Sequence, residues 1–407
     1  MMAMGMMINR YQILCGFIFL QPFVNNINGI TMKLFNISLI GPLFYAASFL
    51  IIALLALSRK NNLGIMFILL LFLIYYDILV VSSRMDIANI GDYVKLVFPI
   101  IIYCFVQKAK LSLKTVSLIN KSIITSIYCY SLFIILSFVL RYQYHEERGG
   151  YFGFVFSVNE LIIFYILALF YLSILRDSKI TSNITTFVAY LLTKSKSAFL
   201  LMPIYMLRFF RKRNKIYVLI SLALLPILIK FMVLSQVSRL YNDYLSDAVS
   251  LGDILNKYDP MFLLTVVSAG RAKYANALFG NIDKNYMDYL IGSGLSGAID
   301  ITDGKVGIEM DVLDAFNIYG VVGVFILFSF YYIPIFRMKL PYYSKIIFFV
   351  VVLYSVFGGH LINNPLCNVY YAIFLGLLCN KNKILTKEFY ALRHGHEYSS
   401  TIQGASA

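Results

Sequence analysis

Long apolar runs separated by short polar segments dominate the pattern of hydrophobic and polar positions along the chain. The runs are continuous over about 20 residues, the length of helix that crosses roughly 30 Å of hydrocarbon. A β-barrel would instead show segments of about 10 residues with alternating polarity. The pattern therefore predicts an all-α, polytopic membrane protein. We expect spans over Tyr11 to Ile30, Ile37 to Leu57, Leu63 to Val81, Val94 to Val106, Val116 to Leu140, Phe152 to Leu175, Ile216 to Leu234, Val312 to Ile335, Ile346 to Gly359 and Leu366 to Leu378.

The apolar block Ile180 to Phe210, interrupted by Lys-Ser-Lys-Ser at 194–197, decides the predicted topology. A single crossing would put the basic residues before the block and the basic cluster at 208–215 on opposite sides, against the positive-inside rule. A hairpin keeps both on the cytoplasmic side. Each arm of about 13 or 14 residues would span only roughly 20 Å. The tip, with Lys194 and Lys196, would then stay near membrane depth and need a watered cavity.

Composition and charge agree with this topology. Of the 407 residues, 60% are hydrophobic and 14% are charged, with a mean hydropathy of +0.77, whereas a soluble protein has about 25% charged residues. The net charge of +15 would suggest nucleic acid as the partner of a soluble protein. With the hairpin included, there are about twelve segments, and most Lys and Arg residues fall on the side of both termini. That side is therefore predicted to be cytoplasmic, and nucleic acid is not an expected partner.

One connection between spans is long. The predicted parts of the chain are N-terminal transmembrane helices (1–234), a large periplasmic loop (235–308), C-terminal transmembrane helices (309–380) and a cytoplasmic tail (381–407). The loop is expected to be partly helical, because apolar residues at 237–248 fall at helical spacing and Asp259-Pro260 is typical of a helix start. Its remainder, Asn281 to Gly307, is glycine-rich and is expected to be irregular. No internal repeat is apparent, which weighs against secondary transport.

Short motifs follow one another in a particular order between residues 145 and 375. They are Thr193-Lys194-Ser195-Lys196-Ser197, Ser268-Ala269-Gly270-Arg271, Ile291-Gly292-Ser293-Gly294, Glu309-Met310-Asp311-Val312-Leu313-Asp314, Tyr319-Gly320-Val321-Val322-Gly323 and Gly359-His360. In this order and sidedness they resemble the O-antigen polymerase and ligase families of bacterial surface polysaccharide assembly. The resemblance implies a multi-pass inner-membrane glycosyltransferase of the C-type superfamily, with a periplasmic active site and no metal or other cofactor. The partners it implies are undecaprenyl-pyrophosphate-linked oligosaccharides as donor and acceptor, membrane lipids and a chain-length regulator protein.

Four basic residues are candidates for binding the substrate pyrophosphate and sugar: Arg271, Lys194, Lys196 and Arg148. A lipid-pyrophosphate leaving group carries several negative charges, and a site without metal must neutralise them with fixed cations. Arg271 is the first choice, because a guanidinium binds two phosphate oxygens at once; a surface salt bridge is the alternative. Two lysines near hydrocarbon depth tend to mark an anionic ligand, although a solvated turn between ordinary spans would explain them too. Arg148 is added on a loose match to the family.

The acceptor sugar hydroxyl needs a general base, and His360 lies at an outer membrane boundary. Nearby cations are expected to keep its imidazole neutral and able to accept a proton. A histidine that hydrogen-bonds to a neighbouring helix is the alternative. Glu309 and Asp311 are rival catalytic residues, and Asp314 is a candidate for substrate binding. All three acids lie at the start of one predicted helix, where negative charge is favourable without any catalysis.

Three functions remain open at this point. The first is a polymerase that joins lipid-linked oligosaccharide repeats, and the second is the related ligase that transfers finished glycan to lipid A core. The third is a flippase for the same lipid-linked sugars, which is not an enzyme. The resemblance favours the polymerase, because acids stand at 309–311 where ligases often have His-Asn. The chain also departs from the family at the hairpin tip, where Lys194 and Lys196 replace the more usual Ser-Arg.

Overall fold

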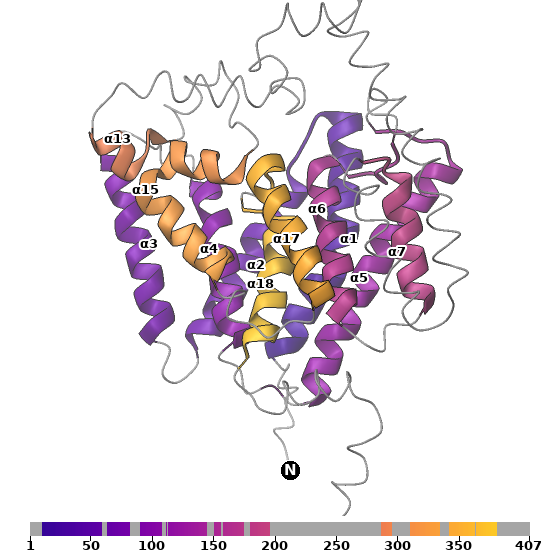
Figure 1. Cartoon of the computed structure of the whole chain (residues 1–407), viewed down its shortest axis with the longest axis horizontal. Coiled ribbons are helices and arrows are strands. Elements are labelled where there is room, and N and C mark those ends of the chain that lie inside the picture. Colours follow the sequence, from indigo (N-terminus) through magenta and orange to yellow (C-terminus); the bar gives the residue numbers. More distant parts are fainter. Residues whose placement is uncertain are drawn as a thin grey trace, which may run out of the picture.

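The computed structural model describes residues 10–58, 63–81, 90–107, 111, 113–144, 150–155, 158–174, 180–195, 286–294, 310–333, 342–362 and 364–380. Regular secondary structure in these segments is helical, apart from an isolated bridge between Phe152 and Phe154. The helices are α1 (Arg10–Phe35), α2 (Ile40–Leu57), α3 (Leu63–Val81), α4 (Ile90–Gln107), α5 (Leu113–Val139), α6 (Val158–Ile174), α7 (Ile180–Leu192), α13 (Tyr286–Ile291), α15 (Asp311–Tyr331), α17 (Tyr342–Gly358) and α18 (Pro365–Cys379). Most run side by side in a bundle (Figure 1). The predicted all-α class is therefore confirmed for the described part of the chain.

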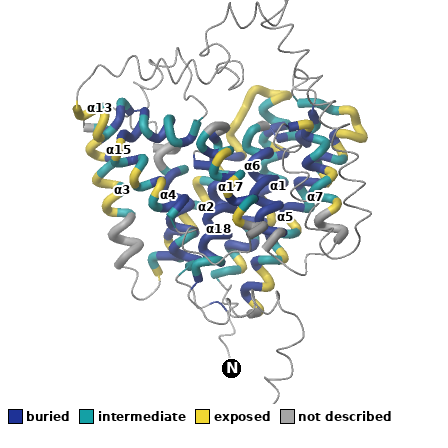
Figure 2. Tube along the Cα trace, viewed as in Figure 1, coloured by how far each residue is buried: buried dark blue, intermediate teal, exposed yellow. Residues whose placement is uncertain are grey.

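Four of the described helices are long and apolar enough to cross a membrane: α1, α2, most of α5 and α15. Their apolar residues are not confined to the core. On α2, Leu43, Leu50 and Leu54 are 59%, 60% and 59% exposed, and Figure 2 shows exposed positions along α3 as well. Rows of exposed leucine are unfavourable in water but match lipid tails. The chain is therefore a multi-span membrane protein. The count of about twelve segments stays a prediction, because Ile216 to Leu234 lies outside the described residues.

Where the structure describes them, the predicted spans agree with the observed helices within about five residues, with one exception. The range Leu63 to Val81 coincides with α3, but the expected span from Phe152 to Leu175 starts too early, because α6 begins at Val158. Residues 150–155 instead form a non-helical turn, in which Gly153 has a φ of 65° and Phe152 and Val155 are buried. A buried turn is as apolar as the helix that follows it, so hydropathy alone does not separate the two.

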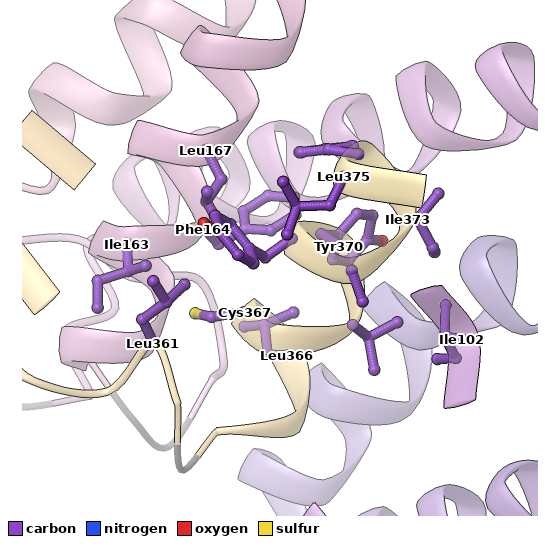
Figure 3. Close-up of a cluster of buried hydrophobic side chains, with 14 of the residues drawn as sticks. Ile102, Ile163, Phe164, Leu167, Leu361, Leu366, Cys367, Tyr370, Ile373 and Leu375 are labelled. Atoms are coloured by element: carbon purple, nitrogen blue, oxygen red, sulfur yellow. The ribbon is translucent and has the colours of Figure 1, made fainter. Parts of the chain in front are cut away.

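Helix α18 lies at the centre of the bundle, and its residues from Leu366 to Leu377 are buried on every side. A helix that is apolar all round is stable only when other helices surround it. Figure 3 shows Tyr370 of α18 packed near Phe164 of α6, with Leu361 from the turn before α18 in the same cluster. The Tyr370 and Phe164 ring centroids are 4.9 Å apart. The core therefore extends from the α18 helix to the turn that precedes it.

Helix ends that are predicted to lie outside meet at one face of the bundle. The N–H of Phe154 donates to Asn26 Oδ1 near the end of α1 (2.9 Å), and Lys33 Nζ donates to the carbonyl of Gln143 after α5 (3.4 Å). The N–H of Tyr151 donates to the carbonyl of Leu192 at the end of α7 (3.0 Å). The ends of α1, α5 and α7 thus lie together, as the alternation of sides in the predicted topology requires.

The first arm of the predicted hairpin is α7, which has 13 residues. This agrees with the short arm expected from Ile180 onward. The arm ends in a turn over residues 193–195, where the N–H of Lys194 donates to the carbonyl of Leu191 (2.9 Å). The second arm and the basic cluster at 208–215 lie outside the described residues. The short first helix is therefore observed, and the hairpin itself stays a prediction.

Helix α15 bends at Gly320, which has a φ of 65° and a ψ of −166°. Figure 1 shows the part before the bend lying across the upper end of the bundle and the part after it descending near α4. A sharp kink deprives carbonyl groups of their helical partners. Two of these are bonded from outside the helix: Ser293 N–H donates to Asn317 O (2.7 Å), and Tyr75 OH donates to Tyr319 O (2.6 Å).

The helix α13, from Tyr286 to Ile291, supplies the segment that ends in Ser293. We expected Asn281 to Gly307 to be irregular, and this short helix is a correction to that prediction. Glycine content over the whole range hides the glycine-free stretch at 281–291, part of which forms a helix where it docks against α15. The predicted helices at 237–248 and after Asp259 lie outside the described residues.

Replacing Tyr75 with phenylalanine should lower the free energy of unfolding by about 1 to 2 kcal/mol, because the carbonyl of Tyr319 loses its donor at the bend. Tyr286→Phe is the matched control, since Tyr286 is 93% exposed, and its effect should stay within about 0.5 kcal/mol. Thermal unfolding of both purified variants in detergent measures the difference. Equal stability of the two variants would show that the Tyr75 hydroxyl does not support the bend.

Candidate functional site

The turn between α17 and α18 carries His360. Helix α17 ends at Gly358, and Gly359 N–H closes it by donating to the carbonyl of Ser355 (3.2 Å). Both Gly359 and His360 then take left-handed conformations, with φ values of 64° and 71°. For a residue with a side chain this costs about 1 kcal/mol or more, and it persists only where the surroundings impose it. The contacts around His360 must therefore hold the turn.

The Asp311 carboxylate accepts hydrogen bonds that hold this turn. Its Oδ2 accepts hydrogen bonds from the backbone N–H groups of Leu361 (2.9 Å) and Ile362 (3.3 Å). The same oxygen accepts a bond from the hydroxyl of Ser355 (2.7 Å). Two consecutive N–H groups directed at one anionic oxygen are typical of backbone anion sites. The first residue of α15 is thus joined both to α17 and to the residues that follow His360.

The hydroxyl chain continues behind Ser355. Because the Ser355 proton is donated to Asp311, the 2.9 Å contact between Tyr332 OH and Ser355 Oγ has the tyrosine as its donor. Ser355 and Tyr332 are 0% and 2% exposed. Hydrogen bonds in such buried chains strengthen one another, since each donor polarises the next. The chain fixes the position of the Asp311 carboxylate.

The other side of the turn is fixed from α18. The side-chain amide of Asn368 donates to the carbonyls of Ile362 (3.0 Å) and Lys95 (2.9 Å), which ties the turn to α4. Asn364 caps α18 by accepting a bond from the N–H of Leu366 (2.7 Å). The turn therefore has partners on both sides, and Leu361 also lies in the buried cluster of Figure 3.

The imidazole of His360 reaches toward α6, where its Nε2 lies 3.2 Å from Asn159 Nδ2. His360 thus does contact a neighbouring helix, which was the alternative reading of this residue. Asp311 also lies within electrostatic range of His360. The expectation that cations surround this histidine is therefore incomplete, because an acid is among its neighbours. His360 is half-buried, so part of the residue is accessible.

The two acids at the start of α15 are both buried, Asp311 at 0% and Asp314 at 5% exposure. The Oδ2 of Asp314 accepts a bond from the N–H of Met310, immediately before the helix (3.1 Å). Closing the first turn in this way is the structural role that acids have at a helix start. For Asp314 the geometry thus supports the structural alternative more directly than sugar binding.

Of the predicted cations, the structure describes Lys194. It has a φ of 51° and is exposed. The backbone of the hairpin tip joins the 150–155 turn through the bond from Tyr151 to Leu192. In Figure 1, α17 and α6 lie between α15 and α7. The convergence of Lys194 on the site around His360 stays a prediction.

Several predicted site residues lie outside the described residues: Glu309, Arg271, Lys196 and Arg148. The structure therefore brings together His360 and Asp311 of the predicted set and leaves these four untested. It also adds residues that were not predicted. Ser355 and Asn368 hold the turn, and Asn159 contacts the imidazole. A polar residue inside an apolar run is the signal that could have identified Ser355 and Asn368.

Among the described residues, no group of three or more His, Cys, Asp or Glu side chains could hold a metal ion. What the arrangement offers is a half-buried imidazole on a turn whose next two N–H groups bond to a buried carboxylate. Such a pair is suited to accepting and stabilising a proton. No protein-family model matches the chain, and no curated protein matches it.

Proposed function

We propose that this protein is a membrane glycosyltransferase that polymerises surface polysaccharide. It joins oligosaccharide repeats carried on undecaprenyl pyrophosphate, at the periplasmic face of the bacterial inner membrane. The observation that carries the proposal is the His360 turn, which Asp311 holds through the N–H groups of Leu361 and Ile362. The order of the family-like motifs in the sequence supplies the substrate class.

His360 is the general base of the proposed reaction. A hydroxyl oxygen of the acceptor sugar attacks the anomeric carbon of the donor chain and forms the new glycosidic bond. The bond between that carbon and the pyrophosphate oxygen breaks, and lipid pyrophosphate leaves with the electron pair. The hydroxyl proton passes to the imidazole, and Asp311 stabilises the resulting cation at close range.

The contact with Asn159 determines which nitrogen takes that proton. The donor in the 3.2 Å contact between Asn159 Nδ2 and His360 Nε2 depends on the imidazole tautomer; we propose the tautomer with its proton on Nδ1, in which Nε2 accepts from the amide. When the acceptor hydroxyl replaces Asn159 at Nε2, the same lone pair becomes the proton acceptor. Asn159 thus holds the imidazole in the neutral tautomer until the acceptor sugar binds.

The leaving pyrophosphate needs positive charge, and the candidates are the predicted cations Arg271, Lys194, Lys196 and Arg148. Arg271 is placed first because its fork matches two phosphate oxygens. Lys194 is exposed at the tip of the first hairpin arm, where a charged headgroup can reach it. Fixed cations at such positions stabilise the charge that develops as the bond breaks.

Purified protein in detergent tests the proposal, with a lipid-linked repeat as both donor and acceptor. We expect products two or more repeats long that remain attached to the lipid carrier. Transfer only onto lipid A core would instead identify the ligase. Movement of intact lipid-linked sugar across a vesicle membrane, without glycan transfer, would identify the flippase. Either of these results would overturn the polymerase.

A further inference from the structure

We infer that Asp311 is a positioning residue, whose carboxylate holds the 359–362 turn in the conformation that presents His360 and does not itself meet substrate. The inference deepens the proposed function and rests on it for the role of His360. It also changes the role that the sequence suggested for Asp311, which was that of a rival general base. The contacts of a single carboxylate oxygen carry the inference.

All three hydrogen bonds to the carboxylate end on Oδ2, while Oδ1 has no hydrogen-bond partner among the described residues and is buried. A carboxylate that served a substrate would direct at least one oxygen outward. Here Oδ2 accepts three bonds from the turn and from Ser355, and Oδ1 is buried away from solvent. The group is therefore arranged to bind this chain and not a sugar.

Burial separates the two residues by role. Asp311, Ser355 and Leu361 are each 0% exposed, whereas His360 is half-buried. A glycan that arrives from the outer face meets the imidazole and has no access to the carboxylate behind it. Asp311 thus acts on the reaction through the turn and through His360.

The left-handed conformation of His360 explains why a carboxylate is needed. The φ of 71° is unfavourable for a residue with a side chain, so the turn relaxes unless its N–H groups are strongly bound. Bonds from N–H groups to a charged acceptor are roughly twice as strong as those to a neutral one. A neutral isostere at 311 keeps the shape but weakens the bonds that oppose relaxation.

Hydrogen–deuterium exchange of the full-length protein in detergent tests the inference without any need for activity. In Asp311→Asn, the amides of Leu361 and Ile362 should exchange at least 10-fold faster than in the wild type. Ser355→Ala, which leaves both amide bonds in place, should accelerate them less. Asp314→Asn is the matched control, because Asp314 lies one turn further along the same helix and bonds to Met310. It should leave exchange at 361 and 362 unchanged.

Kinetics of glycan transfer separate positioning from a general structural role. Because no substrate contact is lost, Asp311→Asn should lower kcat about 100-fold with KM unchanged, the size of effect that a small misplacement produces. In a His360→Asn background, the same change should cost less than 2-fold, because there is no imidazole left to position. A full additional loss in that background would show that Asp311 acts on substrate by itself and would overturn the inference.

Unchanged exchange of the Leu361 and Ile362 amides in Asp311→Asn would also overturn the inference. Equally fast exchange of these amides in Asp314→Asn would do the same. If Asp311→Asn does not fold, amide exchange in Ser355→Ala decides. Wild-type exchange rates of the Leu361, Ile362 and Tyr332 amides in that variant would count against the inference that Asp311 holds the turn. A wild-type protein that transfers no glycan would remove the proposed function, while the exchange result would still decide whether Asp311 holds the turn.

Discussion

Replacing His360 with alanine should collapse the polysaccharide ladder of a strain that depends on this protein to single repeats. Loss of a general base typically costs about 100- to 10,000-fold in rate, and a chain that grows by repeated transfer stops at its first step. The protein should still insert, because His360 is half-buried in a turn and not in the core. Gel analysis of the polysaccharide and immunoblotting of the membrane fraction measure the two outcomes.

Two controls separate loss of the imidazole from damage to the turn. His360→Asn keeps a residue that tolerates the left-handed conformation, so it should insert normally and still abolish the ladder. His394→Ala alters a histidine of the C-terminal tail and should leave the ladder intact. Arg271→Ala should match His360→Ala, since the proposed site needs its charge on the leaving group. Normal ladders from both His360→Ala and Arg271→Ala would remove the proposed site.

The membrane fold could be predicted because its signal is local. A continuous apolar run such as Leu63 to Val81 specifies a helix by its own length and composition, and α3 has the same bounds. The 150–155 turn could not be predicted in this way. Its conformation depends on Asn26, which is 128 residues from Phe154 in the chain. A hydropathy pattern does not report a contact between residues so far apart.

The sequence pointed to the candidate residue His360 but not to the residues that hold its turn. Gly359-His360 at a predicted membrane boundary drew attention to the histidine, because a titratable group there is unusual enough to suggest a function. The role of Asp311 depends on partners that are 44 and 50 residues away, and Asn159 is 201 residues from His360. From sequence alone, an acid at a helix start is equally suited to capping, catalysis or positioning. Only the burial and the bond partners of its carboxylate distinguish these roles.

The bend in α15 should be sensitive to added volume. Gly320 has a φ of 65°, and a Cβ added there would lie 2.5 Å from the backbone of Leu290 and of Gly292. Because both neighbours are backbone atoms, the clash cannot be relieved by a side-chain rotation. Left-handed strain and overpacking together should lower the free energy of unfolding of Gly320→Ala by about 3 kcal/mol. Unfolding of the purified protein in detergent measures this.

Gly16→Ala is the matched control, because Gly16 lies in α1 and a Cβ added there meets nothing within 4 Å. It should leave stability unchanged or raise it by up to about 1 kcal/mol. Gly292→Ala should resemble Gly320→Ala, and the double variant should cost less than the sum, since the two glycines contact each other. Asp311 begins the same helix, so a change in the bend moves its carboxylate away from the 359–362 turn. Gly320→Ala should therefore also speed amide exchange at Leu361, and wild-type exchange there would show that the bend and the His360 turn are independent.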